Sequence, residues 1–350
     1  MKIAVLLSGG VDSSVALRLL KDRERHELTA FYLKVWLEEE LSGLGDCPWQ
    51  EDLEFARRTC AEAGVPLEVV PFQREYRDRV VGYALEELKA GGTPSSDLLC
   101  NQQIKFGAFL DHVGSGFHRV ASGHYARRQR SGSRFRLARS PDPVKDQTYF
   151  LALLSQDQLA RSEFPLGRLT KAQVRALAEE YRLPSRSRPD SQGICFLGKI
   201  PFGGFVRHHL GEKPGEIREA RTGRRLGEHR GYWFHTIGQR RGLGLSGGPW
   251  YVVEKVVAEN LLLVAHLEDM DTAARADFTV ERLHWIDGPP AGEALTVKLR
   301  HGPTLTPCRL ELEATDRGRV TLEAGDPGIA PGQFAVFYSG PYCLGSGVIR

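Results

Sequence analysis

Short apolar runs alternate with amphipathic stretches along residues 1–203. The apolar runs have the length of buried strands and lie at residues 2–7, 28–33, 67–70 and 119–122. The amphipathic stretches have helical spacing and lie at residues 15–20, 51–63, 76–89, 104–112, 147–161 and 171–181. Strands that alternate with helices predict a Rossmann-like α/β domain with a parallel sheet and right-handed crossovers.

The pattern changes at about residue 204. Glycines become frequent and the apolar runs become short up to residue 270, which predicts a small β-rich central domain. From there on, apolar and polar positions alternate at residues 295–299, 309–313, 320–323 and 334–338, which is typical of a small antiparallel β-barrel. The sequence therefore predicts three domains, at residues 1–203, 204–270 and 271–350.

The turn between the first strand and the first helix carries the strongest chemical signal. It reads Ser-Gly-Gly-Val-Asp-Ser-Ser at residues 8–14. Glycines let phosphate oxygens approach the backbone, and a helix N-terminus supplies free N–H groups and a favourable dipole. We expect Asp12 or Ser13 to cap the helix. A carboxylate beside a phosphate needs a cation between them, so Asp12 also suggests Mg²⁺.

Two residues beyond this loop are expected to meet the same ligand. Parallel sheets bind ligands at the carboxyl ends of their strands, and Leu33 and Gly123 follow two further predicted strands. The loop lacks the Gly-Lys-Ser/Thr ending of a Walker A motif and the spacing of a dinucleotide fingerprint. It resembles the PP-loop of the N-type ATP pyrophosphatases, which implies that ATP is split between its α and β phosphates and that the substrate becomes an adenylate.

The six cysteines are scattered and form no C-x-x-C pair, which argues against a zinc ribbon and a secreted disulfide scaffold. Cys100 stands where a helix is predicted to begin, and a helix N-terminus lowers a thiol pKa from about 8.5. Asp97 is placed to exchange a proton with a nearby sulfur. Cys195 lies in a polar loop at the predicted domain junction, where we expect a reactive thiol. We expect the others to be packing residues or, for Cys47, a loop thiol: Cys60, Cys308, Cys343 and Cys47.

Five strings in a fixed order give a more specific resemblance. They are the PP-loop at residues 8–14, Asp-Leu-Leu-Cys-Asn at 97–101, Ser-Gly-His-Tyr at 122–125, Lys-Asp-Gln at 145–147 and Gly-Ile-Cys-Phe at 193–196. Together with the strings at residues 235–240 and 331–338, they make the chain similar to the tRNA-specific 2-thiouridylases, the MnmA/TrmU family. This resemblance covers essentially the whole sequence.

The resemblance implies a two-stage reaction on the wobble uridine of tRNA. ATP adenylates the C2 oxygen, and a persulfide on Cys195 then delivers sulfur to C2. Cys100 would attack that persulfide, which leaves a Cys100–Cys195 disulfide, and Asp97 would act as acid or base. The implied ATP contacts are Leu6, Leu7, Ser8, Gly9, Gly10, Val11, Asp12, Ser13, Leu33 and Gly123. The implied tRNA contacts are Ser95, Ser96 and Asp97 at the flipped uridine, and His124, Lys145, Asp146, Gln147, Arg300, His301 and Gln333 elsewhere.

Composition adds little to this interpretation. The net charge of +3 neither requires nor excludes nucleic acid. No apolar run approaches the roughly 20 residues of a membrane span, and the N-terminus reads as a strand rather than a leader. We therefore expect a cytoplasmic protein that acts on tRNA, receives sulfur from a donor protein and has no membrane contact.

Three alternatives stay open on the sequence. A PP-loop ligase that uses ammonia would need no cysteine pair. A non-catalytic RNA-binding protein would not consume ATP. An iron–sulfur cluster held by Asp97, Cys100 and Cys195 would replace the persulfide, since three ligands leave one iron open for the sulfur.

Overall fold

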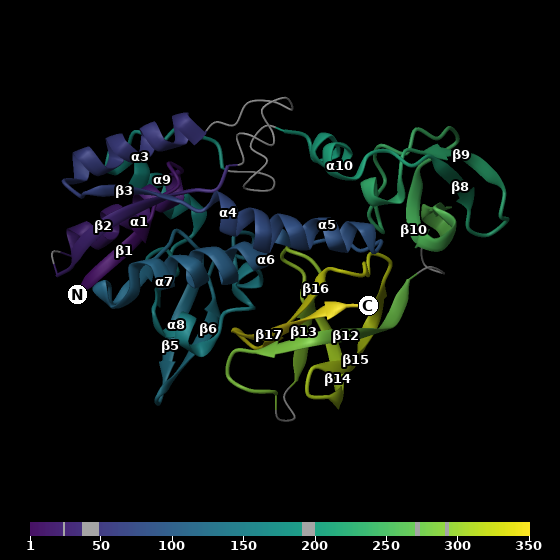
Figure 1. The fold of residues 1–350 in the computed structure, drawn as a ribbon. Coiled ribbons are helices and arrows are strands. Elements are labelled where there is room, and N and C mark those ends of the chain that lie inside the picture. Colours follow the sequence, from purple (N-terminus) through teal and green to yellow (C-terminus); the bar gives the residue numbers. More distant parts are fainter. Residues whose placement is uncertain (24, 37–48, 191–199, 270–273, 291–293) are drawn as a thin grey trace.

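The computed structural model describes residues 1–23, 25–36, 49–190, 200–269, 274–290 and 294–350. Two cysteines considered above, Cys47 and Cys195, lie outside these ranges. The described strands form three sheets, which occupy separate parts of the molecule (Figure 1). The predicted fold class is confirmed, whereas the exact domain boundaries stay predictions.

The N-terminal sheet is parallel, with the strand order β3-β2-β1-β4-β7. Its strands are β1 (Lys2–Leu6), β2 (Glu27–Lys34), β3 (Leu67–Pro71), β4 (Arg119–Ala121) and β7 (Ser162–Glu163). The first strand lies in the middle of the sheet, so the turn that follows it opens at the centre of the carboxyl edge. This is the edge at which parallel sheets bind ligands.

Both faces of this sheet are covered. Successive side chains of β1 point to opposite faces, so Ile3 and Val5 join one apolar cluster and Ala4 and Leu6 join another. Helices α1 (Val11–Asp22) and α3 (Trp49–Ala63) pack in the first cluster. The second cluster contains the long helical run α4 (Gln73–Tyr76), η1 (Arg77–Val81), α5 (Gly82–Lys89), α6 (Ser96–Leu99), η2 (Cys100–Ala108) and α7 (Phe109–Val113).

The single helix predicted for residues 147–161 is wrong. The chain forms a 3-10 helix, η4 (Thr148–Leu151), and then a separate short helix, α8 (Gln156–Ala160). The reason is local, because Ser155 and Gln158 form a capping box that starts a new helix at this point. The next helix, α9 (Lys171–Glu180), is capped in the same way by Thr170 and agrees with the prediction.

The central domain follows helix α10 (Phe202–Leu210). Its sheet has the order β10-β11-β8-β9. The strands are β8 (Gly215–Glu219), β9 (Arg225–His229), β10 (Trp250–Val256) and β11 (Leu261–His266). The 3-10 helices η5 (Tyr232–Phe234) and η6 (Val257–Glu259) lie between these strands, and η7 (Leu267–Asp269) follows β11. A further 3-10 helix, η3 (Gly114–Gly116), follows α7 in the first domain.

The buried His235 makes the stability of the central domain depend on pH. Its side chain is 8% exposed, and burial lowers its pKa from 6.5 to about 4, with smaller contributions from the charges of His229 and Lys255. The unfolded chain therefore takes up a proton below pH 6.5 that the folded chain takes up only near pH 4. We expect the free energy of unfolding to fall by up to about 3 kcal/mol across this window on account of His235 alone.

The measurement is urea unfolding at several pH values between 4 and 6.5. His235→Phe keeps an aromatic ring of similar size and removes the titration. The fall in unfolding free energy toward acid pH should therefore be smaller in His235→Phe than in the unaltered chain. Parallel pH profiles for the two proteins would contradict this prediction.

The C-terminal sheet closes into a barrel in the order β12-β15-β14-β13-β16-β17, with β17 pairing back to β12. Its strands are β12 (Arg275–Trp285), β13 (Leu295–Lys298), β14 (Thr306–Ala314), β15 (Arg317–Asp326), β16 (Phe334–Ser339) and β17 (Tyr342–Ile349). A hairpin from the N-terminal domain, β5 (Ala126–Ser131) and β6 (Arg134–Arg139), adds to the same sheet. Its contact is through β6, which pairs with Tyr342 and Cys343 of β17.

Sequence reasoning predicted no strands at residues 126–139 and so missed this hairpin. The available signal was the Ser-Gly-Ser turn at residues 131–133 between two stretches of alternating side chains. The hairpin matters for function because it connects the first domain to the barrel by backbone hydrogen bonds, and not only by side chains.

Candidate active site

The loop after β1 presents an uncapped helix end at the carboxyl edge of the sheet. The Leu7 N–H donates to the carbonyl of Phe31 at 2.9 Å, which fixes the start of the loop against β2. Helix α1 begins at Val11, and its N-cap residue Gly10 is extended, with no side-chain cap. Since the first N–H groups of a helix have no partner within it, those of α1 are available to a ligand. An anionic phosphate is the ligand such a site favours.

The hydroxyls of the loop bond back to its own backbone. Ser13 Oγ donates to the Gly10 carbonyl at 3.1 Å and lies 3.2 Å from Ser8 Oγ, and Ser14 Oγ donates to the Gly10 carbonyl at 2.9 Å. The expectation that Asp12 or Ser13 caps the helix is therefore wrong. Both lie inside the first turn, and their side chains are used elsewhere.

Glycine is required on both sides of the loop. Gly9 has φ +73°, and a Cβ there would lie 2.1 Å from the carbonyl oxygen of Asp52. A Cβ on Gly123 would lie 2.8 Å from the backbone nitrogen of Ser13. The turn after β4 therefore packs directly on the PP-loop, as the sequence predicted for Gly123.

The apolar residues predicted at the nucleotide site can offer mainly backbone groups. Leu6, Leu7 and Val11 are all less than 9% exposed and belong to the core. Leu33 is half-buried on β2 and packs against the apolar cluster that contains Leu6. It is the one of the four with substantial side-chain surface left for a ligand.

Asp12 already has a cation beside it, supplied by the chain. Its Oδ1 accepts a hydrogen bond from Lys171 Nζ at 2.7 Å and another from the Tyr125 hydroxyl at 2.8 Å. The argument that Asp12 needs Mg²⁺ to sit beside a phosphate is therefore weakened, because the Lys171 ammonium supplies the neutralising charge. The uncapped helix end and the closely packed glycines of the loop fit the phosphates of ATP. For Mg²⁺ the loop offers one carboxylate, Asp12, which already bonds to Lys171 and Tyr125.

Lys171 connects the PP-loop to a second carboxylate, Asp190. Asp190 accepts from Lys171 Nζ at 2.7 Å and from Lys145 Nζ at 2.6 Å, and it also pairs with Arg175. Burial opposes the ionisation of Asp190, but the two lysines outweigh it and lower its pKa. Asp142 fixes the same region by accepting from the backbone N–H groups of Lys145 and Lys171. Lys145 is therefore connected to Asp12 of the PP-loop through the side chains of Asp190 and Lys171.

Three of the predicted tRNA contacts are buried or engaged within the protein. His124 is 9% exposed, its Nδ1 lies 2.8 Å from Ser122 Oγ, and burial holds its pKa well below 6.5. Asp146 is 1% exposed and bonds to Arg139, Lys298 and Thr148. Gln147 Oε1 accepts from the Tyr125 N–H at 3.0 Å. In this structure these side chains position their neighbours, and a direct contact with tRNA stays a prediction.

The segment that carries Ser96, Asp97 and Cys100 is helical. Helix α6 begins at Ser96 with Ser95 as its N-cap residue, and Cys100 follows one turn later at the start of η2. The expectation that Cys100 stands at the helix N-terminus is wrong, because Ser95 and Ser96 occupy that position. The Cys100 side chain is only 4% exposed, and the effect of the helix dipole fades beyond the first turn.

The barrel residues lie next to this helix. Asn101 Nδ2, beside Cys100, donates to the carbonyl of Phe150 at 3.0 Å, and the His301 ring stacks on the Phe150 ring at 4.6 Å. Arg300 is exposed and pairs with Asp326 through both terminal nitrogens. Contacts therefore bring the Cys100 helix and the predicted tRNA residues of the barrel together across η4.

Two tyrosine hydroxyls of the first domain hold the backbone on either side of Gln333. The Tyr149 hydroxyl donates to the carbonyl of Phe334 at 3.1 Å and the Tyr83 hydroxyl to that of Gly332 at 3.4 Å. These two carbonyls flank Gln333. Burial raises the pKa of Tyr83 and of Tyr149, and hydrogen bonds with Ser95 partly offset this rise.

Sequence reasoning missed four residues of this site: Tyr125, Lys171, Asp190 and Tyr149. Tyr125 belongs to the Ser-Gly-His-Tyr string at residues 122–125, but nothing in the sequence indicated that it is buried and that its hydroxyl bonds to Asp12. No local signal marks Lys171, which is 159 positions from Asp12 in the sequence. Contacts over such separations can be found only from the fold.

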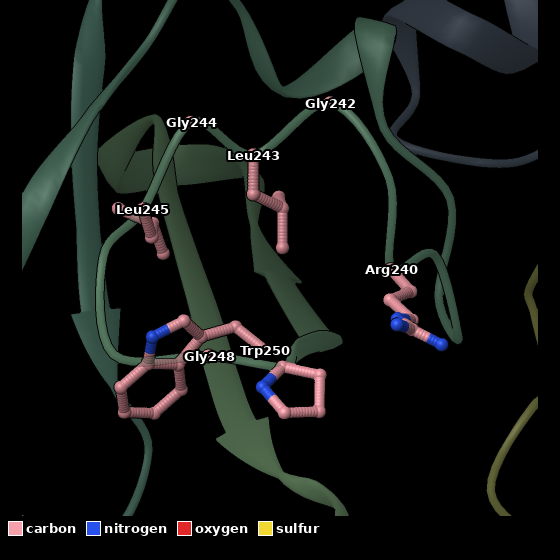
Figure 2. Close-up of a pocket in the computed structure, with 8 residues that line it drawn as sticks. Arg240, Gly242, Leu243, Gly244, Leu245, Gly248 and Trp250 are labelled. Atoms are coloured by element: carbon pink, nitrogen blue, oxygen red, sulfur yellow. The ribbon is translucent and has the colours of Figure 1, made fainter.

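A pocket in the central domain lies apart from these residues (Figure 2). It is lined by Arg240, Gly242, Leu243, Gly244, Leu245, Gly248, Pro249 and Trp250. The Trp250 ring forms one end of the pocket and is held from outside by the His266 ring at 3.7 Å. None of the residues predicted at the active site lines it.

Two kinds of feature are absent from the described ranges. In that part of the chain no helix has both the length and the apolar character needed to cross a membrane. Nor do the described residues contain a group of three or more histidine, cysteine or acidic side chains that could hold a metal ion. Because Cys195 lies outside the described residues, a cluster held by Asp97, Cys100 and Cys195 stays a hypothesis.

Three family models match the chain in succession. They are the tRNA methyl transferase HUP domain at residues 1–199, the tRNA methyl transferase PRC-barrel domain at 203–266 and the aminomethyltransferase beta-barrel domain at 275–349. Among solved structures, the U34-tRNA thiolase NcsA from Methanococcus maripaludis with its [4Fe-4S] cluster covers 60% of this chain and 67% of its own, with a TM-score of 0.36 and 18% identity. A likeness this distant carries no argument about function.

Curated relatives match over the full length. The tRNA-specific 2-thiouridylase MnmA 1 of Bacteroides thetaiotaomicron is 45% identical, over 100% of this chain and 99% of the relative. The MnmA of Porphyromonas gingivalis is 44% identical over the same shares. These matches do not favour the ligase, the RNA-binding protein or the cluster enzyme. With matches to all three domains and to full-length relatives, the chain belongs to the family of the tRNA-specific 2-thiouridylases.

Proposed function

We propose that this protein is a tRNA-uridine 2-sulfurtransferase, which uses ATP to replace the C2 oxygen of the wobble uridine by sulfur. The observation that carries the proposal is the continuity of the site. Asp12 of the PP-loop bonds to Tyr125, Tyr125 bonds to Gln147, and η4, which follows Gln147, bonds to the helix that holds Cys100. This chain of largely buried contacts connects the proposed ATP site to the Cys100 helix.

In the first stage the chain holds ATP for attack on its α-phosphorus. The N–H groups of the first turn of α1 would bind the phosphates, and Gly9 and Gly123 let the neighbouring backbone pack closely enough to hold the loop in shape. The C2 oxygen of uridine attacks the α-phosphorus and pyrophosphate leaves. Mg²⁺ would neutralise charge on the phosphates when bound, and Lys171 beside Asp12 supplies positive charge of its own.

In the second stage the two cysteines deliver sulfur. The Cys100 thiolate attacks the inner sulfur of a Cys195 persulfide, and the S–S bond breaks with its electron pair on the outer sulfur, which leaves as hydrosulfide. Hydrosulfide adds to C2, and AMP leaves with the former C2 oxygen. The cysteines end as a disulfide, having lost two electrons, so a thiol reductant must reset them. Asp97 would move the proton at this step.

The remaining residues would bind the substrate. Ser95, Ser96 and Asp97 would contact the uridine, which must leave its stack to be reached. Lys145, Arg300, His301 and Gln333 have exposed or half-buried side chains that suit phosphate and base contacts on the anticodon arm. A sulfur-donor protein would load Cys195, and the cytoplasm is the proposed compartment.

The test is the reaction itself. The purified protein is incubated with ATP, Mg²⁺, a sulfur donor and unmodified tRNA, and nucleosides are analysed by mass spectrometry. We expect 2-thiouridine, with one AMP and one pyrophosphate released for each base modified. Formation of AMP without a thiolated base would contradict the sulfur step. Stoichiometric iron bound to protein prepared without oxygen would favour the mechanism with an iron–sulfur cluster over the persulfide mechanism.

A further inference from the structure

The chain between α5 and α6 lies where the three domains meet. We call residues 91–95 the joint. Figure 1 shows α5 running from the first domain toward the C-terminus of the chain, with the central domain on one side and the barrel on the other. The end of α5 is fixed to the C-terminal residue, because Glu87 pairs with Arg350 through two contacts of 3.2 Å. The joint begins just beyond this point and leads directly into Ser96.

The central domain contacts the joint through side chains. Lys255 Nζ, from β10, donates to the carbonyl of Gly92 at 3.3 Å and to the carbonyl of His235 at 3.0 Å. The hydroxyls of Thr93 and Thr236 lie 3.3 Å apart. One ammonium therefore bonds to a carbonyl of the joint and to a carbonyl of its own domain, and thereby connects the two.

The barrel contacts the joint through its backbone. The Thr93 N–H donates to the carbonyl of Pro331 at 2.7 Å. The packing leaves no slack, since a Cβ on Gly92 would lie 2.7 Å from Glu87 Oε2 and one on Gly332 would lie 2.8 Å from the Thr93 nitrogen. The barrel thus holds the Thr93 N–H, and the N–H groups of Gly91 and Gly92 bond back to α5. The Gly92 carbonyl is instead held by Lys255 of the central domain, so loss of that bond would free this part of the joint.

The position of the joint sets the position of the target-base residues. Ser95 is the N-cap residue of α6, and Cys100 follows α6 without a break in the helical run. Lys255 is also held in its charged form at neutral pH, since burial lowers its pKa only to about 8. A charged donor makes hydrogen bonds about twice as strong as a neutral one. Among the described contacts, the Lys255 bond to Gly92 is the charged one between the central domain and the joint.

We propose that Lys255 of the central domain is a positioning residue for sulfur transfer, which holds residues 91–95 so that Ser95, Asp97 and Cys100 face the target uridine. It touches none of the reacting groups and acts through the Gly92 carbonyl. This inference rests on the proposed function for its kinetic readout. It gives the central domain a part in the chemistry beyond binding tRNA.

The test compares Lys255→Met with Lys255→Arg in the full chain. Methionine keeps the length of the side chain and removes the donor, whereas arginine keeps a donor and a charge. We expect kcat for 2-thiouridine formation to fall about 10- to 100-fold in Lys255→Met, because a displacement of about 1 Å costs up to about 10²-fold. The KM for tRNA should change less than about 2-fold, and Lys255→Arg should recover most of kcat.

Tyr232→Phe is the matched control. The Tyr232 hydroxyl also crosses from the central domain to the first, where it donates to the carbonyl of Lys89 at 2.6 Å, but this carbonyl lies on α5, before the joint. Tyr232→Phe should keep kcat. If Lys255→Met cannot be purified in folded form, Thr236→Val is the milder alternative. It removes the second contact with the joint and should lower kcat about 2- to 5-fold.

Hydrogen exchange provides a readout that does not need activity. Amides of residues 91–100 should exchange at least about 10-fold faster in Lys255→Met than in Tyr232→Phe. Equal exchange in the two variants, or a loss confined to KM, would overturn the positioning role. If the unaltered protein forms no 2-thiouridine while this difference in exchange is present, the proposed function fails and the contact between Lys255 and the joint stands.

Discussion

Replacing Cys100 by serine should lower the formation of 2-thiouridine by about 10³-fold or more. Serine fits the same space, but its hydroxyl is a far weaker nucleophile toward a persulfide and cannot form the closing disulfide. The side chain is 4% exposed, so the thiol is shielded from solvent in this structure. The measurement is 2-thiouridine per tRNA under single-turnover conditions.

The first stage of the reaction should survive this change. The PP-loop lies on α1 and does not depend on the Cys100 sulfur, so AMP formation that needs tRNA should continue in Cys100→Ser. Cys60→Ala is the matched control, because Cys60 is also buried, at 3% exposure, and burial raises its pKa to about 11. That variant should thiolate normally. Full thiolation by Cys100→Ser would exclude the two-cysteine mechanism.

The sequence was sufficient for those parts of the fold that depend on local pattern. The runs at residues 2–7 and 28–33 are apolar except for Lys2 and Thr29, as is typical of strands buried on both faces, and they form the middle of the parallel sheet. The alternation at residues 320–323 and the apolar run at 334–338 correspond to the barrel strands β15 and β16. The PP-loop was recognisable because few structures need two glycines, an aspartate and three serines in one turn.

What the sequence could not give are the partners of charged groups across long separations. Asp12 was expected to need a metal, and its partner is Lys171, which stands at the start of a helix in a different part of the chain. Asp146 was expected on the surface as a tRNA contact, and it is buried against Lys298 of the barrel. Both differences between expectation and structure have one physical origin. A carboxylate in a polar string is compatible with a surface site or a buried ion pair, and only packing decides between them.

The buried pair of Lys298 and Asp146 should be the most costly ion pair to break. Lys298 Nζ lies 3.1 Å from Asp146 Oδ2, and the two side chains are 0% and 1% exposed. Removing one partner of a buried pair leaves the other charge without compensation, which costs about 3–5 kcal/mol. Asp146 keeps Arg139 at 2.9 Å and the Thr148 hydroxyl at 2.8 Å, so we expect Lys298→Met to lose about 3 kcal/mol of unfolding free energy.

The control for this prediction is an exposed pair in the same barrel. Arg309 and Glu311 are 3.1 Å apart, with side chains 79% and 57% exposed, and such pairs contribute about 0–1 kcal/mol. Urea unfolding of Lys298→Met and Arg309→Met should therefore differ by about 2 kcal/mol or more. Equal losses would mean that Asp146 is compensated by Arg139 alone. A large loss specific to Lys298→Met would show that the barrel and the first domain are joined through Asp146, whose neighbours Lys145 and Gln147 lie between the PP-loop and the predicted tRNA surface.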